Sequence, residues 1–391
     1  MTHVIEVTGT EEGLRVVFGH DEPAAPAEVV DGAPASPPDA ATFLFGWRWL
    51  RDHGEDEASL DPDTLQRRTD TFSIPDDICA EFLEPREDSI DVIWNDGATT
   101  THSWQQLAWC GHMMRSPTRP EPLQIPQHDG IRLWRRPPTF ERFTHEAVMA
   151  DDDDGLAAML RHVQRYGFAV VDGVPAGNEA FEATVSRISY IRHTVFGGVW
   201  ELSAELTDHA DTAYDTTFLE PHTDGTYSHD APGLQVFCCQ ERTGTGGESV
   251  VVDGFAAAAE LSQADTAVLA SVAVAGRYIE PGVHLEAERP ALRTDAHHVL
   301  RQISINNYDR APFMLPPNDQ ERFYEAYGAL RTILNDRDRW TSIRLEPGDM
   351  LIIDNWRALH GRLEYEGTRR FLGCYLNHED FESRLRVLGL D

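Results

Sequence analysis

Apolar residues follow two different spacings along the chain, and each spacing predicts one kind of secondary structure. Within residues 155–166 they recur three and four positions apart, as on one face of an amphipathic helix: Leu156, Met159, Leu160 and Val163. Gly167 stands where such a helix can end, and residues 168–171 form the short apolar run of a buried strand. A second helix is predicted over residues 178–197. The pattern therefore alternates helix, strand and helix.

Beyond residue 230 the apolar residues come in short runs separated by turn residues: residues 233–240, 248–255, 301–308, 349–356 and 369–376. Runs of this length between Gly, Asn and Asp residues are typical of strands. One helical pattern, residues 317–334, interrupts them. The predicted fold class is mainly β, a sandwich or barrel with helices packed outside.

The N-terminal part of the chain predicts a small α+β domain. Residues 4–20 indicate two strands, residues 88–104 indicate a hairpin with an Asn-Asp-Gly turn, and Ser103 can cap a helix over residues 104–114. Prolines are frequent in residues 116–138, which favours a connector. The predicted organisation is therefore a small domain, a connector and a large β domain: residues 1–115, 116–154 and 155–391.

The charge of the chain excludes some partners. It has 33 basic residues, all of them arginine, against 66 acidic residues, for a net charge of −33. Such a surface repels nucleic acid and anionic membranes, and a salt-rich host is an alternative explanation of the acidity. No apolar run is long enough for a membrane span, no N-terminal signal pattern is present, and five cysteines without pairing motifs fit a reducing compartment. We expect a cytoplasmic protein.

A candidate metal site begins at the sequence PHTDGTY, which places His222 and Asp224 two residues apart. On a strand these side chains would point to the same face, although two polar residues in a turn are the alternative interpretation. His360, at the end of a later apolar run, can supply a third ligand. Two histidines and one carboxylate form the facial triad that holds non-haem Fe(II) and leaves three positions open.

A candidate anion site follows the last histidine of this set. Arg369 and Arg370 open the apolar run at residues 369–376, and neighbouring residues of a strand point to opposite faces. One arginine would therefore point inward, where its guanidinium can bind a carboxylate through two hydrogen bonds. The sequence thus combines a triad that fits iron with a buried cation for an acidic cosubstrate.

Five stretches carry a resemblance to a known family: PHTDGTY, GTGGESVVVDGF, INNYDRAPF, IIDNWRALHGR and GCYLNHEDFESRLRVLGL. They resemble the Fe(II)- and 2-oxoglutarate-dependent oxygenases of the gamma-butyrobetaine dioxygenase and trimethyllysine dioxygenase family, and are closer to the latter. The resemblance implies a double-stranded β-helix, or jelly-roll, core. It assigns iron to His222, Asp224 and His360, and 2-oxoglutarate to Arg369 and Ser249.

The resemblance also implies the cofactors. Fe(II), the cosubstrate 2-oxoglutarate and O2 are expected, with ascorbate as reductant. Relatives hold a structural zinc in the small domain, but here GEDEASL lacks their cysteines and Ala98 replaces a histidine. Because a tetrahedral zinc site needs four ligands, we expect no structural zinc and a small domain held by packing alone.

Substrate-binding residues are implied by the same resemblance. Phe196, Trp200 and Tyr214 match the family's aromatic cage, which attracts a quaternary ammonium group, although core packing is the alternative role for each ring. Asp211 stands where an aspartate can bind an α-ammonium. Asn307 or its neighbour Asn306 could bind the substrate carboxylate, with a strand-end turn as the alternative.

Three functions are therefore in competition. The first is a hydroxylase of a trimethyllysine-like amino acid, and the second acts on gamma-butyrobetaine or another small betaine or amino acid. The third is a relative that binds small molecules without turnover, which the complete triad and Arg369 disfavour. The expected partner is a small quaternary ammonium or amino-acid substrate. No nucleic acid or membrane is expected as a partner, and the sequence is compatible with a homodimer.

Overall fold

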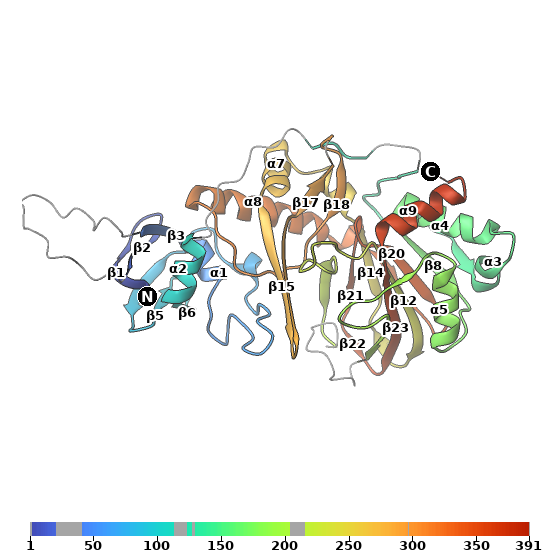
Figure 1. Ribbon diagram of the computed structural model, residues 1–391, viewed down its shortest axis with the longest axis horizontal. Coiled ribbons are helices and arrows are strands. Elements are labelled where there is room, and N and C mark those ends of the chain that lie inside the picture. Colours follow the sequence, from blue (N-terminus) through green and yellow to red (C-terminus); the bar gives the residue numbers. More distant parts are fainter. Residues whose placement is uncertain are drawn as a thin grey trace, which may run out of the picture. The chain divides into compact units, whose positions relative to one another are not determined.

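The computed structural model describes residues 2–20, 41–112, 123–126, 130–203, 216–295 and 297–390. The chain divides into two compact units (Figure 1). The smaller unit comprises Met1–Thr118 with Arg310–Glu325, and the larger one comprises Arg119–Asp309 with Ala326–Asp391. The segment at residues 310–325 joins the smaller unit although it is far from it in the sequence.

The smaller unit contains two three-stranded antiparallel sheets, with strand orders β1-β2-β3 and β4-β5-β6. Its elements are β1 (Thr2–Gly9), β2 (Gly13–His20), β3 (Ala41–Gly46), α1 (Trp47–Asp52), the 3-10 helix Thr71–Ser73, β4 (Ala80–Pro85), β5 (Ser89–Trp94), β6 (Thr99–Ser103) and α2 (Trp104–His112). The predicted strands, hairpin and helix are confirmed here. Oγ of Ser103 accepts a hydrogen bond from the backbone N–H of Gln106 (3.2 Å), so the predicted cap is also confirmed.

A buried ionic network adds to the packing of the smaller unit. The Asp52 carboxylate lies 2.6 Å from a guanidinium nitrogen of Arg310 and 2.8 Å from one of Arg67, and it accepts a hydrogen bond from Tyr324. All four side chains are almost completely buried. The smaller unit therefore contains a buried charged cluster in addition to its apolar packing.

The larger unit is built on two sheets. The seven-stranded sheet has the order β10-β23-β12-β20-β8-β7, with β9 also paired to β23, and the four-stranded sheet has the order β11-β21-β14-β19. Their strands are β7 (Arg142–Thr144), β8 (Phe168–Asp172), β9 (Ile191–Arg192), β10 (Val199–Ser203), β11 (Leu219–His222), β12 (Leu234–Arg242), β14 (Ser249–Asp253), β19 (Thr341–Ile343), β20 (Met350–Asp354), β21 (Ala358–Arg362) and β23 (Arg369–Leu376). The coarse prediction of a mainly β fold is confirmed.

Shorter strands and the helices complete the chain. The strands form two-stranded pairs: β13 (Thr245–Gly246) with β22 (Tyr365–Glu366), β15 (Ala273–Glu280) with β16 (Val283–Pro290), and β17 (Leu292–Thr294) with β18 (Leu300–Ile303). The helices are α3 (His145–Met149), α4 (Asp154–Tyr166), α5 (Asn178–Ser186), α6 (Gly254–Ala258), α7 (Gln263–Ser271), α8 (Pro317–Leu334), the 3-10 helix Arg337–Arg339 and α9 (His378–Val387).

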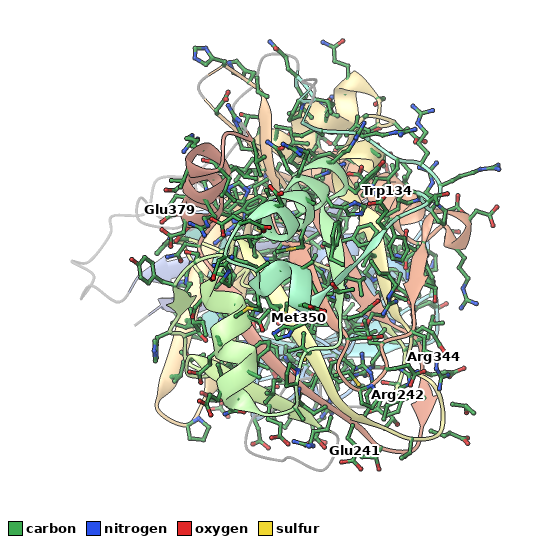
Figure 2. All side chains as sticks on the ribbon, turned by 90° about the vertical axis from the view of Figure 1, so that its right-hand side faces the viewer. Trp134, Glu241, Arg242, Arg344, Met350 and Glu379 are labelled. Carbon is green, nitrogen blue, oxygen red and sulfur yellow. The ribbon has the colours of Figure 1, made fainter. Side chains whose placement is uncertain are left out.

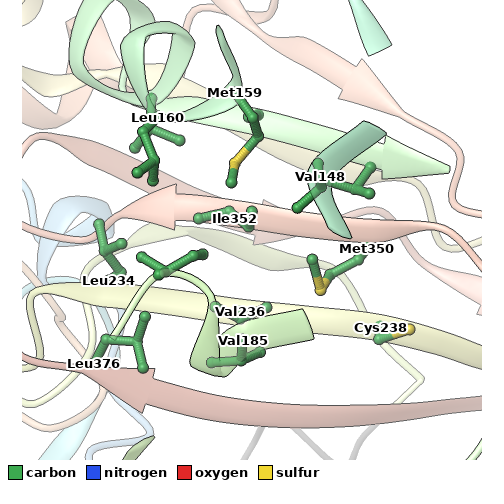
Figure 3. Close-up of a cluster of buried hydrophobic side chains, with 14 of the residues drawn as sticks. Val148, Met159, Leu160, Val185, Leu234, Val236, Cys238, Met350, Ile352 and Leu376 are labelled. Carbon is green, nitrogen blue, oxygen red and sulfur yellow. The ribbon is translucent and has the colours of Figure 1, made fainter. Parts of the chain in front are cut away.

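The two faces of the seven-stranded sheet are covered differently. Helices α3, α4, α5 and α9 lie against one face (Figure 1), and there Ile352 of β20 and Val236 of β12 pack with Met159 and Leu160 of α4 (Figure 3). On the other face, Leu351 packs in a second cluster that includes residues of β14 and β19. Because both faces are buried, the first four residues of β20 are all apolar, which explains the continuous hydrophobic run.

One predicted helix is shorter than expected. The predicted helix over residues 178–197 ends at Ser186, and Ile191 and Arg192 instead pair with Leu376 and Tyr375 of β23. Gly197 then adopts a φ of 92°, which a helix does not permit. By contrast, α4 ends at Gly167 with a φ of 83°, and α8 spans the predicted residues. Tertiary pairing with β23 therefore overrides the local helical pattern.

Candidate metal centre and binding pocket

Three side chains converge where β11 and β21 pair. His222 ends β11 and lies directly opposite His360 of β21. Oδ1 of Asp224 lies 3.3 Å from Nε2 of His222 and 3.8 Å from Nε2 of His360. The donor atoms of these three residues all lie within 4.8 Å of one another, and the described residues hold no other such group of three. The arrangement can hold one metal ion.

The backbone reaches this arrangement by a bend and not by a continuous strand. Since β11 ends at His222, Asp224 lies beyond the strand, so the two side chains do not share a strand face as the sequence suggested. Asn355 fixes the bend, because its Oδ1 accepts from the N–H of Asp224 (2.8 Å) and its Nδ2 donates to the carbonyl oxygen (3.1 Å). The following Gly225 has a φ of 73°, which favours glycine.

The two histidines differ in how readily they are protonated. Burial would lower the pKa of His222, but its hydrogen bond to Asp224 and the negative charge of Asp224 raise it, so a metal ion would replace a proton at Nε2. Nδ1 of His222 lies 2.7 Å from the carbonyl oxygen of Glu220, which can only accept, so Nδ1 carries a proton and Nε2 points to the centre. Burial, followed by the nearby His222, lowers the pKa of His360 to about 3, which leaves its imidazole neutral. Burial would raise the pKa of Asp224, but His360 and His222 hold it well below its usual value.

A pocket of about 970 Å³, part of it open to solvent, surrounds these three side chains. Arg369 and Ser249 line it, and Nη2 of Arg369 lies 3.3 Å from Oγ of Ser249. The Arg369 guanidinium carbon lies 4.1 Å from the ring centre of Phe371. Burial, and then the positive charge of Arg362, lower the pKa of Arg369 to about 9. Because burial destabilises the charged form of this guanidinium, an anionic ligand beside it would be favourable.

The neighbouring arginines are placed differently. Arg370 is partly exposed and faces Glu201 and Glu241 at 3.7 Å, as strand alternation predicts. Arg242 and Arg344 lie near each other (Figure 2) because both face Glu248, at 3.7 and 3.6 Å. Neither of these two lines the pocket.

Two of the three predicted aromatic residues, Phe196 and Trp200, also line the pocket. Trp200 lies on β10 and packs against Phe237 and Tyr375, with ring centres 5.7 and 5.6 Å apart. Phe196 lies in the turn before β10, and its ring centre is 5.3 Å from that of Tyr278. Both Phe196 and Trp200 face the same pocket as the three metal-ligand candidates.

The remaining predicted substrate residues have different positions. Asp211 and Tyr214 lie outside the described residues. Asn306 lines the pocket and donates to Oδ2 of Asp309 (2.8 Å), whereas Asn307 does not line it. Of the two asparagines, Asn306 therefore has direct access to a ligand.

Sequence reasoning missed several polar residues of this pocket: Arg362, Asp309, Gln235 and Tyr375. A weak signal existed for two of them. Arg362 follows His360 by two positions on the same strand, and Gln235 is the one polar residue in the apolar sequence LQVFCC. A lone polar side chain in a fully buried strand needs a hydrogen-bonding partner, which is a reason to place it at a site.

Comparison with known proteins agrees with this geometry. Residues 134–375 match the family described as taurine catabolism dioxygenase TauD, TfdA family, and the chain belongs to it. It is thus a dioxygenase of the class that uses Fe(II) and 2-oxoglutarate. Among the helices that the structure describes, none is long and apolar enough to cross a membrane.

Individual relatives are similar over most of their length. Trimethyllysine dioxygenase of Gallus gallus is 34% identical over 88% of this chain and 84% of its own, and that of Neurospora crassa is 32% identical over 91% and 84%. Gamma-butyrobetaine dioxygenase of Pseudomonas sp. is 28% identical over 93% and 96%. The non-heme iron oxygenase OrfP, solved with Fe, succinate and (3S)-hydroxy-L-Arg, aligns with a TM-score of 0.47 at 14% identity, over 61% and 95%.

Proposed function

We propose that this chain hydroxylates an unactivated C–H bond of a trimethyllysine-like amino acid, using Fe(II), 2-oxoglutarate and O2. The observation that carries the proposal is the convergence of His222, Asp224 and His360 at a pocket whose inner wall holds Arg369. The identity to trimethyllysine dioxygenases over most of the chain supports the choice of substrate. The resemblance to gamma-butyrobetaine dioxygenase supplies the alternative substrate.

In this proposal His222, Asp224 and His360 hold the iron. Nitrogen and carboxylate ligands in this number suit non-haem Fe(II), and the Nδ1 bond of His222 to Glu220 orients the ring as metal-binding histidines require. Bound Fe(II) would supply the activation of O2, coupled to decarboxylation of 2-oxoglutarate to succinate and CO2. The protein itself would orient the substrate and limit the access of water to the buried part of the pocket.

Arg369 and Ser249 would bind the distal carboxylate of 2-oxoglutarate. Arg369 is buried, and the Ser249 hydroxyl at 3.3 Å can share the same carboxylate. The positive charge of Arg362 in the same pocket wall adds to the attraction for a dianion. Ascorbate would serve as the reductant that keeps iron in the Fe(II) state.

The substrate would lie between the iron and the aromatic residues. Phe196 and Trp200, with Tyr214, would attract a trimethylammonium group, and Asp211 would bind an α-ammonium. Asn307, or Asn306 with its direct access to the pocket, would bind the substrate carboxylate. Asp309 also lines the pocket, and its negative charge favours a cationic substrate.

The finer points of fold and location are part of the same proposal. We infer a jelly-roll core from the two facing sheets of the larger unit. An accessory domain over residues 1–115, a connector over 116–154 and an oxygenase domain over 155–391 remain the proposed organisation. A cytoplasmic location stays a prediction from the sequence, as does the absence of a structural zinc.

A succinate-release assay tests the proposal. Protein loaded with Fe(II) is supplied with 2-oxoglutarate, ascorbate and, separately, trimethyllysine, gamma-butyrobetaine, lysine and other betaines. Trimethyllysine should give the highest ratio of hydroxylated product to succinate. Better turnover of gamma-butyrobetaine than of trimethyllysine would favour the alternative function, a gamma-butyrobetaine hydroxylase. Turnover of lysine but of no trimethylammonium compound would refute the proposal that the aromatic residues bind a trimethylammonium group.

A further inference from the structure

Two hydrogen-bond donors converge on one oxygen of the Asp224 carboxylate. The Tyr375 hydroxyl donates to Oδ2 (2.8 Å), and Nε2 of Gln235 donates to the same atom. The other oxygen, Oδ1, is the one that faces His222 and His360. The two oxygens of one carboxylate are therefore in different environments, one held by protein donors and one directed to the metal centre.

The two donors come from neighbouring strands in a fixed register. Gln235 of β12 lies directly opposite Tyr375 of β23 in the seven-stranded sheet, whereas His360 belongs to the other sheet. Gln235 is 2% exposed and Tyr375 is 6% exposed. The sheet register therefore brings both donors to the same point, and their burial restricts the positions that they can adopt.

The hydrogen bonding of Gln235 is directed to this carboxylate. Among the described residues, Oε1 of Gln235 is buried without a hydrogen-bond partner, while its amide nitrogen donates to Asp224. A glutamine whose role were only to fill a buried strand would leave an unsatisfied acceptor at a net cost compared with an apolar side chain. Its presence is therefore better explained by the carboxylate that it contacts.

We propose that Gln235 and Tyr375 are positioning residues that hold Asp224 as a ligand through Oδ1 alone. This inference rests on the proposed iron site. Because the lone pairs of Oδ2 are used by two donors, ligation through both oxygens would require those hydrogen bonds to be broken. With ligation through Oδ1 alone, Asp224 would take up a single position at the metal and would leave the others to the cosubstrate and O2. The pair therefore controls how many positions the metal offers.

Tyr375 also connects the metal centre to the substrate side of the pocket. Its ring centre lies 5.6 Å from that of Trp200, one of the two aromatic residues in the described part of the predicted cage. A displacement of Trp200 by a ligand would thus act on the ring that carries the Asp224 hydrogen bond. Tyr375 therefore contacts both the Asp224 carboxylate and one ring of the predicted cage.

Metal affinity of the protein without substrate tests the proposal. Anaerobic titration with Fe(II), followed by calorimetry, is carried out on Tyr375→Phe, Gln235→Leu and the double variant. Loss of partners that orient metal ligands costs roughly 10- to 100-fold in affinity, so each single variant should raise the Kd for Fe(II) about tenfold or more. The Kd for 2-oxoglutarate, measured on the Fe(II)-loaded protein, should also rise, because a chelating position becomes available to Asp224.

A matched control comes from the same strand. Gln240 of β12 accepts from the N–H of Gly177 and donates to Sγ of Cys238, outside the pocket. Gln240→Leu therefore removes a glutamine of equal size and should leave the Kd for Fe(II) within about twofold of the wild type. Equal loss in Gln240→Leu, or unchanged affinity in the two single variants and the double variant, would overturn the proposal.

The outcomes separate this inference from the proposed function. If the wild type binds Fe(II) and 2-oxoglutarate but turns over no substrate of the panel, the substrate proposal fails and the titration still decides the roles of Gln235 and Tyr375. If the wild type binds no Fe(II), the iron site and this inference fail together. Thermal unfolding of the metal-free variants shows whether each one is folded before its affinity is interpreted.

Discussion

Nη2 of Arg369 lies 3.3 Å from Oγ of Ser249, and this contact joins β23 of the seven-stranded sheet to β14 of the four-stranded sheet. Both side chains are more than nine-tenths buried. The contact closes the inner wall of the pocket with one cation and one hydroxyl. A dianionic cosubstrate entering there would meet a charged donor and a neutral donor at the same place.

Replacement of Arg369 should weaken 2-oxoglutarate binding far more than replacement of its neighbour. Loss of a buried charge-paired donor costs about 2–5 kcal/mol, so Arg369→Ala should raise the KM for 2-oxoglutarate by about thirtyfold or more. Arg370→Ala is the matched control, because this partly exposed side chain faces only Glu201 and Glu241 in the described part of the chain. Steady-state kinetics with varied 2-oxoglutarate decides between them, and greater sensitivity at Arg370 would refute the assignment.

Each residue of the triad should be required for iron binding. We expect His222→Ala, Asp224→Ala and His360→Ala to lose stoichiometric Fe(II), measured by metal analysis, and with it iron-dependent succinate formation. Circular dichroism should show an unchanged fold, since these side chains lie at a pocket and not within the hydrophobic clusters.

A further His-x-Asp sequence, His378-Glu379-Asp380, provides the control for the triad. His378 stacks on Trp356 with ring centres 4.2 Å apart and belongs to no metal-ligating cluster of the described residues. His378→Ala should therefore keep its iron. A second tightly bound metal that persists in His360→Ala would contradict the predicted loss of the structural zinc.

Glycine at position 373 is required for the placement of Trp200. A Cβ atom at Gly373 would lie 2.1 Å from the Trp200 indole, which lines the pocket. Gly373→Ala should therefore push the indole out of place, with an overpacking cost of about 1–3 kcal/mol. We expect kcat/KM for the trimethylammonium substrate to fall about tenfold or more, while the Kd for Fe(II) changes little.

A second glycine of the larger unit provides the control, because its replacement by alanine should not displace any side chain. Gly328 lies in α8, and a Cβ there would have no atom within 4 Å. Because alanine is preferred over glycine in a helix by about 1 kcal/mol, Gly328→Ala should keep full activity and raise the thermal midpoint. If Gly373→Ala behaves like Gly328→Ala, Trp200 has no role in substrate binding.

The sequence predicts elements whose formation depends on local pattern. Helix α8 and the helix that ends at Gly167 are found because their apolar spacing extends over several turns and their ends carry recognisable signals. Five strands of the two sheets, β8, β12, β14, β20 and β23, are found for a similar reason, since each contains a short run of mostly buried apolar residues. The sequence singles out His222, Asp224 and His360 because histidine and aspartate are common metal ligands. This reasoning does not depend on the course of the backbone, which bends after His222 where the sequence suggested a strand.

Features set by tertiary register could not be predicted in this way. The strand β9 is only two residues long, and it is defined by its pairing with β23. Its own sequence continues the helical pattern of α5, so the sequence alone predicts a helix there. The opposition of Gln235 and Tyr375 depends on the register between β12 and β23, and no pattern within either strand encodes it. The association of residues 310–325 with the smaller unit likewise depends on the buried contact between Asp52 and Arg310.

The last prediction concerns the stability of the smaller unit in mild acid. His102 on β6 is fully buried, and its Nε2 lies 2.9 Å from Oγ1 of Thr100, which itself accepts a hydrogen bond from the Trp94 indole. Burial lowers the pKa of His102 from 6.5 to about 4. The folded protein therefore keeps this imidazole neutral at a pH where the unfolded chain protonates it.

The direction of the effect follows from proton binding. Between pH 6.5 and about 4 the unfolded state binds more protons at His102, so the free energy of unfolding falls as the pH decreases through this range. At 1.36 kcal/mol per pKa unit, the loss between pH 6.5 and 5 is about 2 kcal/mol. His102→Gln should remove this part of the pH dependence, as measured by urea unfolding at several pH values. His284→Gln, at an exposed histidine, should keep the wild-type slope. Equal slopes in wild type and His102→Gln would show that His102 can be protonated without unfolding.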